Sequence, residues 1–350
     1  MANETRWSLQ LDVDTVVDRC AEIWAALAGR HLFITGGTGF VGCWLLETLC
    51  RANDRLNLSI RATVLTRSPA RFAAKAPHLA GHRLVTLLQG DVCNFEADGQ
   101  FSHLIHAATD ASADLNENNP LRMFDTVLMG TRRALEFAVL HQTSRVLFLS
   151  SGAVYGNQPW EIEHIAETYT GGPNCLNARS AYGEAKRAAE MLCAIYAKQH
   201  RLEVPIARIF ALLGPYLPLG IHFAAGNFID QAIHGRPIVV QGNGMPQRSY
   251  LYAADLTVML WHMLVRGRSL EPYNLGSDEA ISIADLAKLV GRTLGQPQVE
   301  ILGAQDLGWN LGRYVPATRK LAEDLGLEGT VSLEESIVRT ALWHGWKAKQ

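Results

Sequence analysis

Tyr182 and Lys186 are the two residues whose types and spacing most directly suggest chemistry. Four residues apart on a helix, the phenol and the ammonium lie on one face. A phenol has a pKa of about 10, and bringing that pKa to neutrality requires about 4 kcal/mol. Ser151 ends an apolar run and offers a second hydrogen bond to a reacting oxygen. We interpret these three residues as a proton-transfer site. The alternative is a core tyrosine with a surface lysine.

A glycine-rich turn provides the second chemical feature. Three glycines follow the apolar run at 31–34 with the spacing G-x-x-G-x-x-G, and an apolar helix begins directly after them. A turn without Cβ atoms and the free N–H groups of a helix N-terminus together suit a pyrophosphate, although an ordinary tight turn is the alternative. The residues expected to contact a dinucleotide here are Gly36, Thr38, Gly39, Phe40, Val41 and Gly42.

The elements that position these residues alternate along the chain. Apolar runs predict strands at 31–34, 60–66, 84–88, 103–108 and 145–149, with helices between them. This alternation is typical of an α/β fold with a doubly wound parallel (Rossmann) sheet. Ligands of such sheets lie beyond the carboxyl ends of the strands, which is where the polar candidates fall.

The end of the second predicted strand bears on the choice of cofactor. A carboxylate there would bind the ribose 2′-hydroxyl of NAD and repel the 2′-phosphate of NADP. This chain has Thr66 and Arg67 instead, followed by Ser68 and Arg71. Hydroxyls and guanidinium groups suit a phosphate, so we favour NADP(H), with NAD(H) as the alternative. Arg67 could also be a simple solvated charge.

Further cofactor contacts are expected at the ends of the third and fourth strands. Asp91 and Val92 could meet the adenine, although Asp91 could equally form a turn. The small side chains of Ala107 and Ala108 let a flat cofactor approach the backbone, and Thr109 follows them.

The bulk properties exclude several classes of protein. The chain has 350 residues and a net charge of −2, so no basic field recruits nucleic acid or an anionic membrane. No apolar run is long enough to span a membrane, and no signal peptide is recognised. The six cysteines lack C-x-x-C spacing and are expected to be reduced, mostly buried thiols of a cytoplasmic protein. The histidines show no ligand spacing, so no metal is expected.

The domain organisation is predicted as three parts. Residues 1–28 form an extension with an amphipathic helix over 12–28, which we expect to pack on its own domain. Residues 29–211 form the dinucleotide-binding domain. Residues 212–350 form mostly a smaller substrate lobe, with parts near 240–265 returning to the first domain. Ser282 is expected to cap the helix at 283–294.

Taken in order, these motifs resemble an extended short-chain dehydrogenase/reductase of the NAD-dependent epimerase/dehydratase family, which acts on nucleotide sugars. The resemblance covers nearly all of residues 29–345. Beyond the three motifs above, it is carried by Arg208-Ile209-Phe210, Gly214-Pro215, Pro237-Ile238, Gly242-Asn243-Gly244, Arg248-Ser249-Tyr250, Asp255, Tyr273-Asn274-Leu275-Gly276, and the tail from Lys320 to Leu327 with Trp343.

The resemblance implies roles for particular residues. It makes Ser151, Tyr182 and Lys186 the catalytic residues, and it implies that the segments around Asn227 and Arg248 grip a nucleotide diphosphate. Asp110 lies where relatives place substrate-contacting or catalytic side chains. The resemblance also implies a homodimer formed through the helices near 120–141 and 178–200. Independently of it, Arg313 could reach a phosphate or could be a solvated loop arginine.

Departures from the family pattern narrow the expected activity. Dehydratases of this family follow the strand-end hydroxyl residue with Asp-Glu, and decarboxylating relatives keep a glutamate there. This chain has Gly152 and Ala153, which cannot transfer protons. A 4,6-dehydratase or a decarboxylase is therefore disfavoured. Thr126 and Ala211 replace asparagines that are usual in the family, which leaves the nicotinamide and sugar contacts open.

These observations predict an NDP-sugar 4-epimerase that works by transient oxidation at C4. The closest alternative is an NADPH-dependent reductase of NDP-4-keto-sugars, which the sequence Thr66-Arg67 favours. A different class, a binding protein that senses NADP(H) without catalysis, has no use for an activated phenol. The nucleotide and the sugar are not specified by the sequence.

Overall fold

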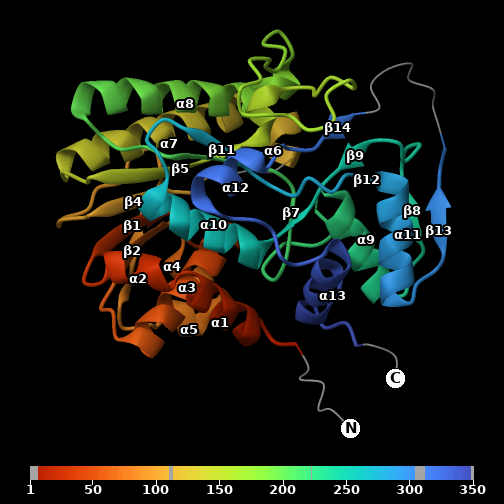
Figure 1. Ribbon diagram of the computed structural model, residues 1–350, viewed down its shortest axis with the longest axis horizontal. Coiled ribbons are helices and arrows are strands. Elements are labelled where there is room, and N and C mark those ends of the chain that lie inside the picture. Colours follow the sequence, from red (N-terminus) through yellow and green to blue (C-terminus); the bar gives the residue numbers. More distant parts are fainter. Residues whose placement is uncertain (1–6, 110–112, 222, 304–311, 348–350) are drawn as a thin grey trace.

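A seven-stranded parallel sheet forms the centre of the molecule (Figure 1). The computed structural model describes residues 7–109, 113–221, 223–303 and 312–347. The strand order is β11-β6-β5-β4-β1-β2-β3, so the chain winds outward in both directions from β1 and β4. This is the doubly wound α/β fold predicted from the sequence. The strands are β1 His31–Thr35, β2 Arg61–Thr66, β3 Val85–Gln89, β4 His103–His106, β5 Arg145–Ser151, β6 Ile206–Ile209 and β11 Pro272–Leu275.

Helices cover both faces of this sheet, because successive side chains of a strand point to opposite sides. Leu32 and Ile34 of β1 join one core cluster with α3 and α10, whereas Phe33 joins a second cluster with α7 and α8. The helices in the described residues are α1 Leu9–Arg19, α2 Ala21–Leu27, α3 Phe40–Leu56, α4 Pro69–Lys75, α5 Pro77–Ala80, α6 Ala113–Asn118, α7 Pro120–Leu140, α8 Ala181–His200, α9 Ala224–Ile233, α10 Ala253–Arg266, α11 Ile283–Leu294, α12 Arg319–Leu325 and α13 Leu333–Trp343.

The N-terminal segment forms two helices, whereas the sequence pattern predicted one over 12–28. At Cys20 the backbone leaves helical geometry, with φ −106° and ψ 19°, between α1 and α2. The break directs Trp24 into the core, where its indole donates to Val17 O at 2.9 Å and its ring centroid lies 4.9 Å from that of Trp261. The apolar faces of both helices are buried, and α1 packs on α3 and α10.

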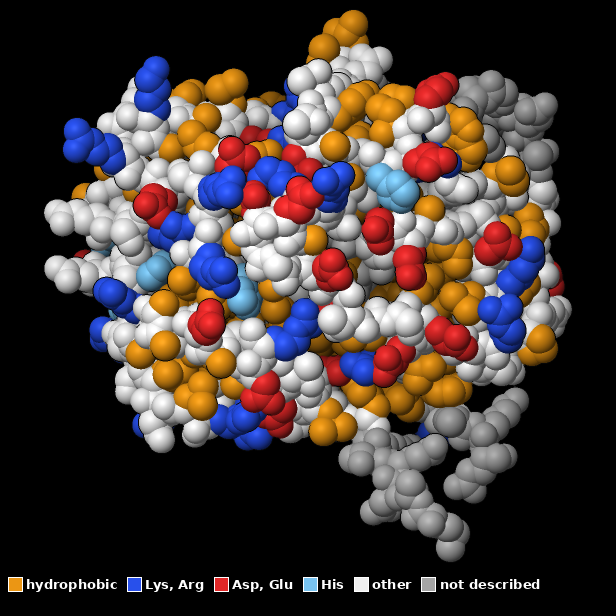
Figure 2. All heavy atoms as spheres, in the orientation of Figure 1, with side chains coloured by type: hydrophobic (Ala, Val, Ile, Leu, Met, Phe, Trp, Pro, Cys, Tyr) orange, Lys and Arg blue, Asp and Glu red, His pale blue; other side chains and the backbone are white. Residues whose placement is uncertain are grey.

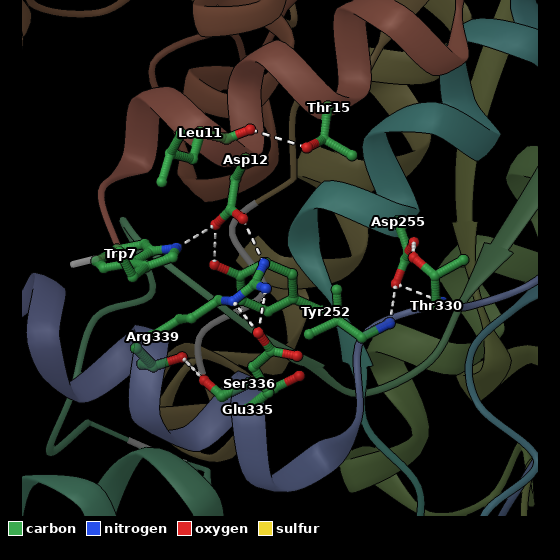
Figure 3. A network of polar contacts seen from close by, with 12 residues as sticks. Trp7, Leu11, Asp12, Thr15, Tyr252, Asp255, Thr330, Glu335, Ser336 and Arg339 are labelled. Atoms are coloured by element: carbon green, nitrogen blue, oxygen red, sulfur yellow. Dashed lines mark hydrogen bonds and ion pairs between the residues drawn. The ribbon is translucent and has the colours of Figure 1, made fainter. Parts of the chain in front are cut away.

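A polar cluster of four side chains, Trp7, Asp12, Tyr252 and Arg339, ties α1 to the C-terminal part of the chain (Figure 3). The buried Asp12 carboxylate accepts hydrogen bonds from the Tyr252 hydroxyl at 2.6 Å and the Trp7 indole at 2.8 Å, and it forms an ion pair with Arg339 of α13. We call these four residues the Asp12 cluster.

After β6 the chain alternates between the main sheet and a smaller lobe. Helix α10 and strand β11 belong to the main sheet and its layers, whereas α9, α11 and α13 share a separate core (Figure 1). Ser282 caps α11 as predicted, since its hydroxyl accepts from Asp285 N at 3.0 Å. The short strands of this part are β7 Leu212–Leu213, β8 Ile238–Val240, β9 Gln247–Arg248, β10 Leu251–Tyr252, β12 Ile281–Ser282, β13 Val299–Ile301 and β14 Arg313–Tyr314.

The surface carries charges of both signs. Figure 2 shows acidic and basic side chains interspersed over one face, in agreement with the net charge of −2. In the described part of the chain, no helix is both long and apolar enough to cross a membrane. All six cysteines are free thiols, and four of them are buried.

Candidate active site

The glycine turn between β1 and α3 is built so that only glycine fits at two of its positions. Gly36 has φ +71°, and a Cβ there would lie 2.5 Å from the backbone of Ala107 and Ala108. A Cβ on Gly42 would lie 2.4 Å from Gly36 O. Gly39 is the N-cap of α3, so the first N–H groups of a long helix face this turn. The cradle therefore fits a pyrophosphate, which requires close backbone approach and unpaired N–H donors.

The end of β2 carries hydroxyl and guanidinium groups, in the order that the sequence gives. Thr66 is buried and its Oγ1 accepts from Ser68 N at 3.3 Å, and Ser68 in turn caps α4 by accepting from Arg71 N. Arg67 and Arg71 are exposed. This arrangement keeps the strand end free of a carboxylate.

Asp91 forms the turn that was the alternative to an adenine contact. Its carboxylate accepts from Cys93 N at 2.9 Å, and its side chain is exposed. Val92 beside it packs on α7, where a Cβ on Gly130 would lie 2.9 Å from Val92 Cγ1. These contacts neither require nor prevent an adenine beside the turn.

The small residues after β4 lie against the glycine turn. Ala107 N donates to Thr35 O at 3.1 Å, and Ala108 N donates to Thr35 Oγ1 at 3.2 Å. Thr109 Oγ1 is buried and makes no hydrogen bond of standard geometry within the described residues. Asp110, the expected substrate contact that follows, lies outside the described residues.

Ser151, Tyr182 and Lys186 come together where β5 meets the start of α8. Gly183 permits the close approach, since a Cβ there would lie 2.7 Å from Ala153 O in the 3-10 helix η1 (Gly152–Tyr155). Lys186 is buried, its ammonium donates to Leu149 O at 2.7 Å, and it lies 6.0 Å from the centroid of the Tyr182 ring. The predicted spacing therefore places phenol, ammonium and hydroxyl on one side of α8.

Burial and two neighbouring hydroxyls determine the electrostatics of the Tyr182 phenol. Burial raises its pKa, while the Ser151 and then the Thr109 hydroxyl lower it. The Lys186 ammonium is directed to a backbone carbonyl of β5. Burial lowers the pKa of Lys186 itself to about 8.

Tyr314 is a site residue that the sequence analysis missed. Its hydroxyl would lie 2.6 Å from a Cβ on Gly152, and so would the ring of Phe210. Burial raises the pKa of the Tyr314 phenol, the neighbouring Ser151 hydroxyl lowers it, and Tyr182 and Arg248 act on it electrostatically. Tyr314 thus occupies the space that a side chain at position 152 would need. No local spacing connects it to Ser151, because the contact depends on the pairing of β14 with β9.

The predicted nucleotide-binding residues lie in the smaller lobe. Asn227 of α9 lines a pocket of about 350 Å³ together with β8 and the loop 241–246, and its buried Oδ1 has no hydrogen-bond partner among the described residues. Arg248 pairs in register with Tyr314, and its Nη1 donates to Gly312 O at 2.7 Å. An unpaired buried acceptor in a polar pocket is typical of a site that receives a ligand donor.

Arg313 lies on a short strand and not in a free loop, and its contact with a phosphate stays a prediction. It lies on β14, where its guanidinium donates to Gln247 Oε1 at 3.0 Å and to Trp160 O at 3.2 Å. The guanidinium carbon lies 4.3 Å from the centroid of the Trp160 ring. The described contacts of Arg313 thus serve to hold the 160–162 loop beside β14.

A glycine-turn Rossmann sheet with serine, tyrosine and lysine at its carboxyl edge defines an extended short-chain dehydrogenase/reductase, and the chain is therefore an enzyme. Within that class it belongs to the NAD dependent epimerase/dehydratase family, whose sequence model matches residues 32–276. The match spans the glycine turn, β5, α8 and β11, which are the elements that build the site.

Curated relatives cover most of the chain. A UDP-glucuronic acid decarboxylase of Xenopus tropicalis is 32% identical over 316 residues, which are 89% of this chain and 71% of the relative. A UDP-glucuronic acid decarboxylase of Arabidopsis thaliana is 31% identical over 313 residues, 89% of this chain and 87% of the relative.

Solved structures share the fold at lower identity. The UDP-glucose 4-epimerase of Thermotoga maritima, solved with UDP-glucose, has a TM-score of 0.77 and 21% identity and covers 90% of this chain and 98% of its own. A dTDP-glucose 4,6-dehydratase of Streptomyces venezuelae, solved with NAD, has a TM-score of 0.76 and 23% identity and covers 89% of this chain and 96% of its own. Three different activities therefore share this architecture.

Proposed function

We propose that this enzyme is an NDP-sugar 4-epimerase, which oxidises and reduces the sugar at C4 with a nicotinamide cofactor. The observation that carries this proposal is the filling of the space beside Gly152 by the Tyr314 phenol and the Phe210 ring. In the family pattern, dehydratases have Asp-Glu at the positions of Gly152 and Ala153, and decarboxylases keep a glutamate there. The Ser151 and Thr109 hydroxyls are the groups that lower the pKa of Tyr182, and Gly152 and Ala153 offer no acid. Epimerisation needs only one proton acceptor and one hydride.

The roles of the residues follow from their positions. When bound, the oxidised nicotinamide supplies a hydride acceptor and a positive charge that favours the phenolate. Tyr182 takes the proton of the C4 hydroxyl while C4 is oxidised. When the hydride returns to C4, Tyr182 gives the proton back to the C4 oxygen. Ser151 donates a hydrogen bond to that oxygen, and the Tyr314 phenol beside Gly152 orients the serine hydroxyl. Lys186 contributes positive charge beneath the phenol.

The substrate is proposed to be a nucleotide diphosphate sugar, with the nucleotide in the pocket lined by Asn227. The relatives named above act on UDP- and dTDP-sugars, and the unpaired Asn227 Oδ1 is suited to accept an N–H or O–H donor of such a ligand. Arg248 supplies a guanidinium between that pocket and the tyrosines, where a diphosphate would need a cation.

We further propose that the cofactor is NADP(H). The end of β2 supports this choice, because Thr66, Arg67 and Ser68 offer no carboxylate to bind a 2′-hydroxyl or to repel a 2′-phosphate. The family is NAD-dependent, so NAD(H) is the alternative. Comparing the affinities of NAD and NADP by fluorescence titration tests this point. Tighter binding of NADP supports the proposal, and tighter binding of NAD contradicts it.

The β2 end also favours one second candidate function, an NADPH-dependent reductase of NDP-4-keto-sugars. A reductase consumes one NADPH in each turnover, whereas an epimerase returns the hydride and leaves the cofactor unchanged. Both activities use the same three side chains in the same roles. They are distinguished by stoichiometry.

The deciding experiment incubates the purified enzyme with a panel of NDP-hexoses and each cofactor, and identifies the products by NMR. Inversion at C4 with catalytic cofactor supports the epimerase. Strict consumption of NADPH with a 4-keto-sugar supports the reductase. Loss of CO2 from a UDP-uronic acid would contradict both, and would show that a carboxylate at position 152 or 153 is dispensable.

We also propose a homodimer formed through α7 and α8. These helices pack on each other, and they expose Leu121 and Met129 of α7 and Met191 of α8 at 70%, 46% and 62%. Burying such side chains against a second copy would remove apolar surface from water. Analytical ultracentrifugation tests this, with a charged substitution Met191→Glu expected to shift the protein to monomer.

A further inference from the structure

Glu190 lies on the same face of α8 as the catalytic pair. Tyr182, Lys186 and Glu190 follow one another at intervals of four residues, which places each side chain one turn from the next. The sequence analysis did not single out Glu190, because a glutamate on an amphipathic helix is usually solvated. Its side chain is only 14% exposed.

The Glu190 carboxylate connects α8 to the ends of two strands. Its Oε1 accepts from Ser150 Oγ at 2.6 Å and from Arg208 Nε at 3.0 Å, and its Oε2 accepts from Arg208 Nη2 at 2.7 Å. Ser150 and Arg208 are in register across β5 and β6. Since Ser151 is the next residue of β5, this carboxylate fixes the strand end that presents the catalytic hydroxyl.

The contact continues into a buried network. Arg208 Nη1 donates to the Tyr155 hydroxyl at 2.9 Å, and that hydroxyl donates to Asn274 Oδ1 at 2.7 Å. Asn274 lies on β11, so the network joins α8, β5, β6, η1 and β11. We call Ser150, Glu190, Arg208 and Tyr155 the Glu190 cluster. These contacts link the Ser151 end of β5 to α8.

Glu190 is also the negative charge near Lys186. On α8, the other neighbours of the ammonium are the Tyr182 phenol and Cys193, a thiol that stays protonated because burial raises its pKa. From β5 it meets Leu149 O and the Phe148 ring. From β4 it faces His106, which burial keeps neutral by lowering its pKa to about 3.

We propose that Glu190 is a positioning residue of the active site, which holds the Ser151 end of β5 against α8 and keeps Lys186 charged. This inference rests on the proposed function for its kinetic consequences, but its electrostatic part does not. Burial lowers the pKa of Lys186 to about 8, and Cys193 and Glu190 act in the opposite direction. Removing the Glu190 charge therefore favours the neutral amine.

The first test needs no substrate. Side-chain NMR of the full chain, labelled at lysine Cε and assigned with Lys186→Met, follows the titration of Lys186. In Glu190→Gln the midpoint should fall below that of the wild type, and in Glu190→Asp it should return most of the way. Glu184→Gln on the same helix is the matched control, because Glu184 pairs at 3.8 Å with Arg187 instead. Equal midpoints in Glu190→Gln and wild type would overturn the inference.

The second test is kinetic. Glu190→Gln should lower kcat about tenfold with little change in KM, and the alkaline limb of the kcat profile should move to lower pH. Wild-type kcat and profile in this variant would overturn the positioning role. If the wild type turns over no nucleotide sugar at all, the proposed function fails and the NMR titration alone decides this inference.

If Glu190→Gln does not fold, a variant that removes both charges of the Glu190–Arg208 ion pair provides the test. Replacing a whole buried ion pair is better tolerated than leaving one charge unpaired. Glu190→Gln/Arg208→Gln should still lower the Lys186 midpoint, because the carboxylate one helical turn from the ammonium is removed. A wild-type midpoint in the double variant would contradict the inference.

Discussion

The Glu190 cluster and the Asp12 cluster contain the same kind of contact in two regions of the molecule. In each, a carboxylate pairs with an arginine, with side-chain exposures of 14% and 14% for Glu190–Arg208 and 5% and 18% for Asp12–Arg339. Each carboxylate also accepts from a hydroxyl at 2.6 Å. The first lies between α8 and the ends of β5 and β6. The second joins α1, β10 and α13 on the other face of the main sheet (Figure 3).

Burial and ion pairing therefore do not identify a functional carboxylate. What distinguishes the two clusters is what their neighbours do. Beside Glu190, Ser150 is one residue from Ser151 and Lys186 is one helical turn from Tyr182. Beside Asp12, Tyr252 and Arg339 instead connect the two ends of the chain. We expect changes near α8 to alter rates and changes near α1 to alter stability.

Tyr182→Phe should have the largest effect, confined to the catalytic side. Removing the only proposed proton acceptor should lower kcat by about 10³-fold, with cofactor affinity and melting temperature nearly unchanged. Tyr196→Phe, on the same helix, is the control and should behave as wild type, because the substitution keeps the ring and removes a hydroxyl that donates to Glu136 at 3.5 Å. Retained turnover in Tyr182→Phe would contradict the expectation that changes near α8 alter rates.

Asp12→Ala should destabilise the fold by about 3 kcal/mol and leave the pH profile of kcat unchanged. It removes the acceptor of Tyr252 and of the Trp7 indole, and it leaves Arg339 with Glu335 as its remaining carboxylate. Chemical denaturation measures this. The control is Asp14→Ala on the same helix, whose pairs with Arg51 and Arg55 are more exposed and should contribute about 1 kcal/mol or less. Equal effects of the two variants would contradict the role of the Asp12 cluster.

The pH dependence of stability gives a finer test of the same cluster. Burial raises the pKa of Asp12 above its ordinary value of 3.8, against the lowering effects of Tyr252 and Arg339. An acid whose pKa is higher in the folded than in the unfolded state contributes less to the free energy of unfolding as the pH rises from 3.8 through its folded pKa. The difference in unfolding free energy between wild type and Asp12→Ala should therefore change across that range, and a constant difference would contradict it.

Gly36→Ala tests the glycine turn, and we expect this substitution to change both cofactor binding and stability. The new Cβ meets the backbone of Ala107 at 2.5 Å, so the turn must shift where the pyrophosphate binds. We expect the cofactor Kd to rise about tenfold to a hundredfold, for a strain of about 1–3 kcal/mol. Gly29→Ala is matched to it, with the same φ of +71° but nothing within 4 Å. Equal cofactor affinities in the two variants would contradict the assigned turn.

The wild-type pH profile should give the smallest but most specific effect. Because burial lowers the pKa of Lys186 to about 8, the lysine loses its proton above that pH, and kcat should decline there. A profile that stays level well above this pH would show that the charge of Lys186 is not required.

Local motifs made much of this site predictable. The glycine turn, Ser151, and the pair Tyr182 and Lys186 depend on contacts within one strand, one turn or one helix, and their placement on a parallel sheet follows from the alternation of elements. The ends of strands moved by one or two residues; β5 extends to Ser151, for example, whereas the apolar run ended at Leu149.

Contacts between distant segments were not predictable in this way. Tyr314 reaches Ser151 only because β14 pairs with β9, and two-residue strands have no periodicity to recognise. The sequence pattern around Glu190 is typical of a surface position. Only the fold places Arg208 of β6 beside it. The break at Cys20 is equally invisible in the apolar spacing, which continues across it, because it depends on the contact of Trp24 with Trp261.

The central claim is that this site removes a hydride from C4 while Tyr182 takes the proton of the C4 hydroxyl. The most direct measurement is a single turnover of wild type and Tyr182→Phe with an NDP-hexose deuterated at C4, followed by mass spectrometry of cofactor and sugar. In the wild type we predict deuterium on the cofactor during the turnover and then at C4 of the inverted sugar, and in the variant none on the cofactor. Inversion at C4 with no deuterium on the cofactor at any time, or transfer that persists without the phenol, would contradict the claim.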